Sequence, residues 1–167
     1  MTEAIDTVKS SETKEAIICL MEKDSRNLDY INRGIAQISN DPVPFLIDIM
    51  MDDSLAMMDS RGEGYFPITA TSLLADINDV RAIKPMVSLL SDIDPMSVHY
   101  GELERCLSLF AKGNLDFLLD IYGKIDQDDV KDTMCNAFDM AKIVNDRVFA
   151  LHLESLKRGH EIAPYMR

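Results

Sequence analysis

The stretch Leu74-Ala75-Asp76-Ile77-Asn78-Asp79 decides the fold, because its pattern occurs four times along the chain. Each copy has a large apolar residue, an alanine, a short spacer and then Asn or Asn-Asp. A small side chain near the end of a helix lets the next helix cross closely, and Asn or Asp can cap the start of that next helix. Each copy therefore predicts a helix end, a tight turn and a helix start. The four alanines are Ala36, Ala75, Ala111 and Ala141.

The alanines stand 39, 36 and 30 residues apart, about the length of one helical hairpin with its connector. After three of the turns, large apolar residues follow with the spacing i, i+3, i+4, i+7, which forms one apolar stripe along a helix. Gly113 before Asn114 predicts a helix C-cap directly ahead of an N-cap. Pro42 and Pro95 stand where a first helical turn tolerates proline. The stripes are Val43, Leu46, Ile47 and Met50; Ile83, Met86, Val87 and Leu90; and Leu115, Leu118, Leu119 and Tyr122.

These signals predict one all-α domain over residues 1–167, with about four helical hairpins and an extra N-terminal helix that caps the first hairpin. No segment has the period-two alternation of a strand, so we expect no sheet. The acidic, glycine-containing residues 52–64 are expected to form the main irregular connector. The expected helices span residues 12–22, 27–38, 43–57, 66–76, 80–91, 96–111, 115–122, 127–142 and 146–157.

The segment from Tyr65 to Leu90 resembles a HEAT-like repeat of the phycobilisome-lyase type. In that family an alanine- and leucine-rich helix ends in a short Asp-containing turn, and the next helix opens with Arg-Ala, an apolar residue and a proline. The resemblance implies a HEAT-like α-solenoid that serves as a protein-binding scaffold, or an accessory subunit or lyase-type enzyme of the same family. The other copies lack the Arg-Ala element. The matching residues are Asp79, Arg81, Ala82, Ile83 and Pro85.

Composition narrows the functional classes. A net charge of -12, from 17 basic and 29 acidic residues, opposes nucleic-acid binding, which needs cations against phosphates. It suits a basic partner or high solubility. No apolar run approaches the roughly 18 residues that can cross a bilayer, and residues 1–9 lack the pattern of a secretory signal. Three widely spaced cysteines match no metal or redox motif, which predicts buried free thiols in a reducing cytoplasm. They are Cys19, Cys106 and Cys135.

No motif predicts catalysis or a cofactor. The single His160-Glu161 pair is too little for a di-iron site, so no metal is expected. Asp126-Gln127-Asp128-Asp129 lacks the glycine and the final carboxylate of an EF-hand loop, and is predicted to be a helix start. His152 is expected to be a partly buried helix residue. Four methionines between Met50 and Met58 predict either core filling or an adaptable binding surface.

The expected function is a non-catalytic scaffold or adaptor that binds another protein. In a HEAT-like array the second helices line one surface, so the residues opposite their stripes would face a partner with a basic surface. A lyase or metal-dependent hydroxylase and a nucleic-acid handler are the alternatives, and the oligomeric state stays open. Asp79 and Arg81 are expected to form a structural turn pair. The expected partner-binding residues are Asp48, Lys84, Ser88, Asp116 and Asp120.

Overall fold

The fold is that of a computed structural model, which describes residues 2–24 and 27–162 and, among these, the side chains of 10–24 and 27–158. Within these ranges every regular element is a helix and no strand occurs, so the all-α prediction is confirmed. The elements are α1 (Thr2–Lys23), α2 (Leu28–Ile38), α3 (Val43–Met50), the 3-10 helix η1 (Asp53–Leu55), α4 (Tyr65–Ile77), the 3-10 helix η2 (Val80–Ala82), α5 (Ile83–Leu90), α6 (Val98–Tyr122), α7 (Asp128–Met140) and α8 (Asp146–Ile162).

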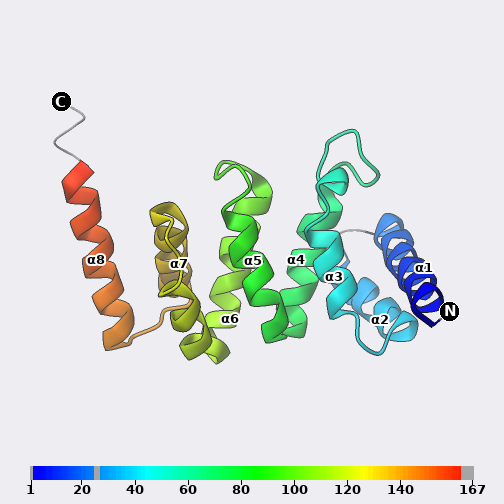
Figure 1. Cartoon of the computed structure of the whole chain (residues 1–167), viewed down its shortest axis with the longest axis horizontal. Coiled ribbons are helices and arrows are strands. Elements are labelled where there is room, and N and C mark those ends of the chain that lie inside the picture. The colour runs from blue at the N-terminus through cyan, green and yellow to red at the C-terminus, as the bar shows by residue number, and fades with distance from the viewer. Residues whose placement is uncertain (1, 25–26, 163–167) are drawn as a thin grey trace.

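The helices stand side by side in a row that runs from α1 at one end to α8 at the other (Figure 1). The turns after α2 and α4, at residues 39–42 and 78–79, lie on the lower edge of this view. The long connectors at residues 51–64 and 91–97 lie on the upper edge. Short turns and long connectors are therefore on opposite edges of the row.

Several predicted helix boundaries differ from the structure: the first helix begins at Thr2 instead of residue 12, and the last ends at Ile162 instead of residue 157. The third helix ends at Met50, not at residue 57, because Asp52 takes an extended conformation and its side chain accepts a hydrogen bond from the Ser54 amide. That bond caps η1 and starts the irregular connector earlier than expected. The predicted connector at residues 52–64 is confirmed, with η1 as its only helical part.

The predicted break between residues 111 and 115 is a kink inside α6. Only Asn114 leaves the helical region, with φ -130° and ψ 31°, and Gly113 forms no separate C-cap. The Asn114 side-chain amide donates to the Phe110 carbonyl at 3.3 Å, which satisfies an acceptor that the break exposes. The same amide lies 3.4 Å from the side-chain oxygen of Asn78. The third of the four predicted turns is thus a change in the direction of one helix and not the end of that helix.

One continuous core fills the row, and all three predicted stripes contribute to it. Of their residues, only Ile47 and Leu115 are partly exposed, and the rest are buried. The core also contains three phenylalanines at 0–1% exposure, each from a different helix. Burial of side chains of this size is the main stabilising term of such a fold. The phenylalanines are Phe66, Phe110 and Phe138.

The predicted small-residue positions are confirmed in three copies and wrong in the first. Ala75, Ala111 and Ala141 are buried, but Ala36 is exposed. In the first copy the close approach is two residues earlier, at Gly34, where an added Cβ would overlap the Leu20 side chain of α1. The residue of α2 that lies against Leu20 of α1 is therefore a glycine, which has no side-chain carbon.

Helix α4 is the most enclosed element. Nine of its 13 residues are buried, and it packs against α3 on one side and α6 on the other. Its buried residues include Thr69, Thr71 and Ser72, which carry hydroxyl groups into the interior. A sequence with one charged residue in 13 suits a helix that meets protein on most of its faces.

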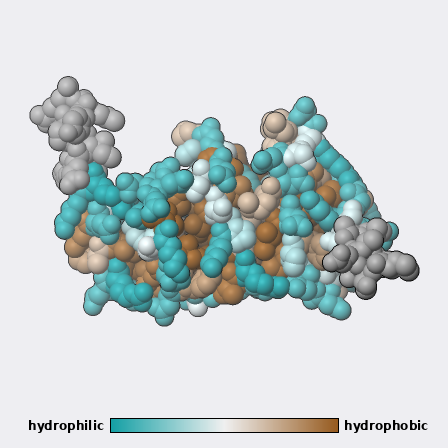
Figure 2. All heavy atoms as spheres, viewed as in Figure 1, coloured by the Kyte–Doolittle hydropathy of each residue, from teal (hydrophilic) through white to brown (hydrophobic). Residues whose placement is uncertain are grey.

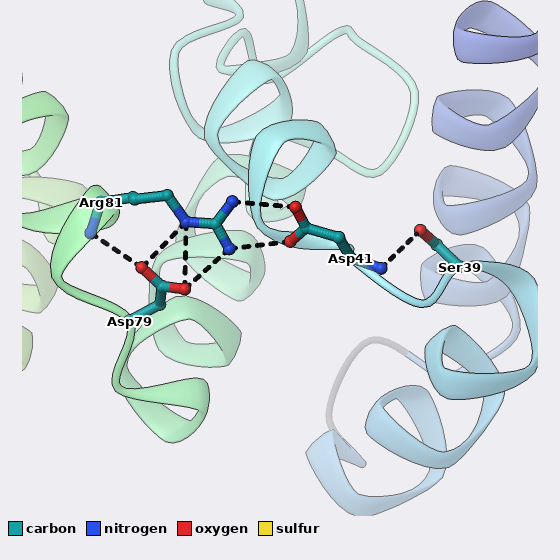
Figure 3. A network of polar contacts seen from close by, with 4 residues as sticks. All are labelled: Ser39, Asp41, Asp79 and Arg81. Atoms are coloured by element: carbon teal, nitrogen blue, oxygen red, sulfur yellow. Dashed lines mark hydrogen bonds and ion pairs between the residues drawn. The ribbon is translucent and has the colours of Figure 1, made fainter.

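The turn pair predicted at Asp79 and Arg81 is confirmed and extends to a third residue (Figure 3). The Asp79 carboxylate accepts from the Arg81 amide at 2.9 Å and from its guanidinium at 2.7–3.1 Å. The same guanidinium donates two bonds of 2.8 Å to Asp41 in the preceding turn, and the Asp41 amide donates to the Ser39 hydroxyl at 3.2 Å. Hydrogen bonds from Arg81 lower the pKa of both carboxyls, so the network joins successive turns at neutral pH.

Candidate functional site

The five residues predicted to bind a partner are all exposed on α3, α5 and the second half of α6. Around Phe117 the structure brings Lys84 and Asp120 together. The Lys84 ammonium lies 5.9 Å from the centroid of the Phe117 ring, and its charge helps Lys124 to lower the pKa of Asp120. Ser88 is one turn further along α5.

The other two predicted residues face elsewhere. Near Asp48, the Lys14 ammonium of α1 lies 3.5 Å from the Asp48 carbonyl oxygen. The Asp116 carboxylate pairs with Arg147 of α8 at 2.6 Å, and Asp120 pairs with Lys124 at the same distance. Two of the three carboxylates in the predicted partner-binding set, Asp116 and Asp120, are therefore already paired with cations of this chain.

Arg147 was missed in the sequence, although a signal was present. The Asn145 side chain accepts from the Arg147 amide at 2.9 Å, as the Asp79 side chain does from the Arg81 amide. In both places an Asn or Asp two positions before an arginine caps a helix start, and the arginine reaches an aspartate of the preceding repeat. The shared pattern is Asn/Asp-x-Arg, without the alanine that follows Arg81.

A pocket of about 300 Å³ lies between the two upper connectors, at the ends of α4 and α6. One wall is formed by Ala56, Met58 and the residues from Glu63 to Tyr65, and Ile68 lies between the walls. The other wall is formed by Ile93, Asp94 and the residues from Ser97 to His99. Gly64 is required for the first wall, because its φ is 78° and an added Cβ would lie 2.8 Å from the Ala56 carbonyl oxygen. On the second wall, Asp94 accepts from the Met96 amide at 2.8 Å, and Ser97 caps α6.

His99 is the polar residue of the pocket wall that contacts α4. Its Nε2 lies 2.9 Å from the Thr71 hydroxyl, which itself lies 2.8 Å from the Pro67 carbonyl. A carbonyl can only accept, so the Thr71 hydroxyl donates to Pro67 and accepts from Nε2–H, which leaves Nδ1 as the acceptor. Burial lowers the pKa of His99, against a smaller opposing effect of Glu102, so the imidazole is uncharged at neutral pH.

This histidine and threonine do not form a nucleophile–base pair. A general base must accept the proton of the nucleophile, but the Thr71 proton points to Pro67, and Thr71 is 0% exposed. On the neighbouring turn of α6, the Glu102 carboxylate accepts a hydrogen bond from the Ser72 hydroxyl and two from the Arg105 guanidinium, at 2.6 and 2.8 Å. Burial opposes the ionisation of Glu102, but these hydrogen bonds outweigh it and lower its pKa. The whole network ties α4 to α6 and shapes the pocket.

The mouth of the pocket combines apolar and acidic side chains. Met58 and Val98 line the pocket and are 81% and 74% exposed. Met96, in the connector that carries the second wall, is 90% exposed, and Figure 2 shows apolar atoms at the tips of both upper connectors. Residues 51–64 contain four acids and one arginine, and residues 91–97 contain two acids and no base. That arginine, Arg61, is paired with Glu15 and Glu22 of α1. The rim is thus strongly acidic.

Of the methionines between Met50 and Met58, some fill the core and others are exposed on the surface. Met50 is in the core at 1% exposure, whereas Met57 and Met58 are in the connector at 62% and 81%. The sequence did not predict the second wall of the pocket, which is formed by Ile93, Asp94 and the residues from Ser97 to His99. A signal existed, since both long connectors carry large apolar residues among acids.

The remaining predictions have mixed outcomes. Cys106 and Cys135 are buried and free, and burial raises the pKa of both thiols, but Cys19 is exposed beside Arg61. His152 is partly buried, as expected, with its Nε2 3.1 Å from Asp139. Asp128 and Asp129 stand in the first turn of α7, as predicted. The side chains of His160 and Glu161 lie outside the described residues.

Within the part of the chain that the structure describes, no group of three or more His, Cys, Asp or Glu side chains could hold a metal ion. Over the same residues, no helix is long and apolar enough to cross a membrane. Comparisons with known proteins find no matching family model and no significantly similar curated protein or solved structure. The resemblance to HEAT-like repeats therefore stays a proposal.

Proposed function

We propose that this chain is a HEAT-like α-solenoid of about four hairpins that acts as a non-catalytic scaffold and binds another protein at the upper-edge pocket. The observation that carries the proposal is this apolar pocket of about 300 Å³, built from two connectors and surrounded by exposed methionines and acids. The repeated turns, the single core and the row of helices support the solenoid.

The pocket favours a segment that carries one large apolar side chain between basic residues. A buried leucine side chain contributes roughly 1.5–3 kcal/mol, and the soft thioether of Met58 in the pocket lining can adapt to its shape. Lys or Arg on either side would meet Glu63 and Asp94 at the rim. Opposite charges at a rim raise the rate of association and exclude acidic segments.

The test uses labelled peptides with one central leucine and flanking lysines, against the same peptides with central serine or flanking glutamates. We expect binding by the first peptide only, and weaker binding as salt rises. Val98→Glu should weaken binding at least about tenfold, because it places a carboxylate at the pocket. The matched control is Val80→Glu, a 43% exposed valine at the lower edge, which should leave binding unchanged.

Two results would speak against this site. Binding that is equal in wild type and Val98→Glu would show that the pocket is not used. Loss of binding in Asp116→Lys/Asp120→Lys, with Val98→Glu unaffected, would instead place the partner on the surface predicted from the sequence.

A further inference from the structure

Helix α8 presents two apolar faces, and only one of them is covered. Val148 and Leu151 face α7, at 2% and intermediate exposure. On another side of the helix, Phe149 is 64% exposed, Leu153 44% and Leu156 63%. These three have the spacing i, i+4, i+7, so they form a second stripe along α8.

The other end of the row is built differently. Among the described side chains of helix α1, Ile17 and Met21 are buried, and no large apolar residue is exposed. A terminal helix with a polar outer face is the usual cap of a helical array. The stripe on α8 lacks this polar outer face, which indicates that another surface packs on it.

A hollow adjoins the stripe at the start of α8. It has a volume of about 340 Å³, and Val144 at its edge is fully exposed. Its apolar lining is Ile143, Val148 and Phe149, and its polar lining is Asp139, Asn145, Asp146 and His152. Figure 2 shows apolar atoms over the lower part of α8, where this hollow lies. The exposed apolar surface thus extends beyond the three residues of the stripe.

The charges beside the stripe identify the occupant. Asp146 and Lys157 are 11 positions apart, which is close to three helical turns, so both lie on the same side of the stripe, at opposite ends. Both are exposed, and neither forms an ion pair among the described residues. An antiparallel helix with the same sequence would place its Lys157 on Asp146 and its Asp146 on Lys157.

The net charge of this region also permits a second copy. Residues 146–158 contain two acids and three bases, whereas the whole chain carries -12. Two copies that meet at α8 therefore keep their acidic surfaces apart.

We propose that two copies of this chain pair through α8, antiparallel about a two-fold axis. Phe149 and Leu153 form the centre of the interface, and Leu156 of the second copy enters the hollow beside Val148. Asp146 and Lys157 pair twice, once at each end, because a two-fold interface repeats every contact.

Sedimentation equilibrium of the full chain at about 0.15 M salt, where charges are screened beyond roughly 8 Å, tests the proposal. We expect a monomer–dimer equilibrium. Leu153→Glu should weaken the dimer at least about 100-fold, because it buries two carboxylates at the axis. Val80→Glu, which adds the same charge far from α8, should not change it.

Charge exchange tests the antiparallel arrangement without altering the apolar stripe. Asp146→Lys and Lys157→Asp should each weaken the dimer about tenfold, since two attractive pairs become repulsive. The double variant should restore it. Circular dichroism checks that each variant keeps its helices.

Three outcomes would overturn the proposal. They are a monomer at millimolar concentration, a dimer that Leu153→Glu leaves intact, and a double charge variant that associates no better than the single ones. Val98→Glu should still form the dimer, so failure here and failure of the proposed function at the pocket are separate results.

Discussion

Two methionines ten positions apart provide a direct test of the core. Met86 in α5 is 0% exposed, and Met96 in the following connector is 90% exposed. The same substitution by alanine removes three heavy atoms from each. At Met86 the lost transfer free energy is roughly 2 kcal/mol, and the cavity left in a close-packed interior brings the cost to about 2–5 kcal/mol.

We therefore expect Met86→Ala to lower the free energy of unfolding by about 3 kcal/mol. For a chain of 150–250 residues, each kcal/mol shifts Tm by roughly 2–4 °C, so Tm should fall by about 6–12 °C. Met96→Ala should change the free energy by less than about 0.5 kcal/mol. Met86→Leu, which nearly keeps the volume, should cost less than about 1.5 kcal/mol.

The assay is urea denaturation followed by far-UV circular dichroism, with the three variants and wild type in parallel. A cost below about 1 kcal/mol for Met86→Ala would refute the placement of α5 against the core. Equal costs at the two methionines would refute it as well, because one side chain is enclosed and the other lies in solvent.

Three further predictions concern the turns, the connectors and the pocket. A double-mutant cycle of Asp41→Asn and Arg81→Gln should give a coupling of about 0.5–1 kcal/mol that falls with salt; zero coupling would contradict the link between turns. Gly64→Ala should destabilise by about 2 kcal/mol, since its φ is positive and a carbonyl blocks the Cβ. Gly101→Ala, with open space around the new Cβ, should raise the free energy of unfolding by about 0.5–1 kcal/mol. If Gly101→Ala were less stable than Gly64→Ala, the backbone conformations at both glycines would be contradicted. Burial lowers the pKa of His99 below its ordinary 6.5, so the contribution of the neutral imidazole to stability is full above pH 6.5 and is lost as the pH falls below it. His99→Gln should therefore lose less stability than wild type between pH 7 and 5. Equal losses of unfolding free energy in the two proteins would contradict this.

Local sequence signals predicted the helices well, because each depends on residues within one or two turns. The stripe from Ile83 to Leu90 is buried as a repeat of 3.6 residues requires. The alanine pattern correctly predicted a buried small residue in three of four copies. It was wrong at Ala36, because the approach there depends on where Leu20 of α1 lies, and a local pattern carries no information about that helix.

The contacts that shape the candidate site join residues far apart in sequence. The guanidinium of Arg81 reaches Asp41 across 40 positions, and His99 reaches Thr71 across 28. The pocket needs the connector conformation set by Gly64, which no periodicity predicts. Its two walls could be expected to be exposed and apolar, but their approach follows only from the packing of α4 against α6.

The enclosure of α4 has a consequence for how the molecule opens in solution. Its backbone amides lie between α3 and α6, so their exchange with deuterium requires the row to come apart around them. Helix α8 packs mainly on α7, so its amides need only one pair of helices to separate. Protection against exchange should therefore decrease outward from α4, and the chain should fray from its ends while its middle remains closed.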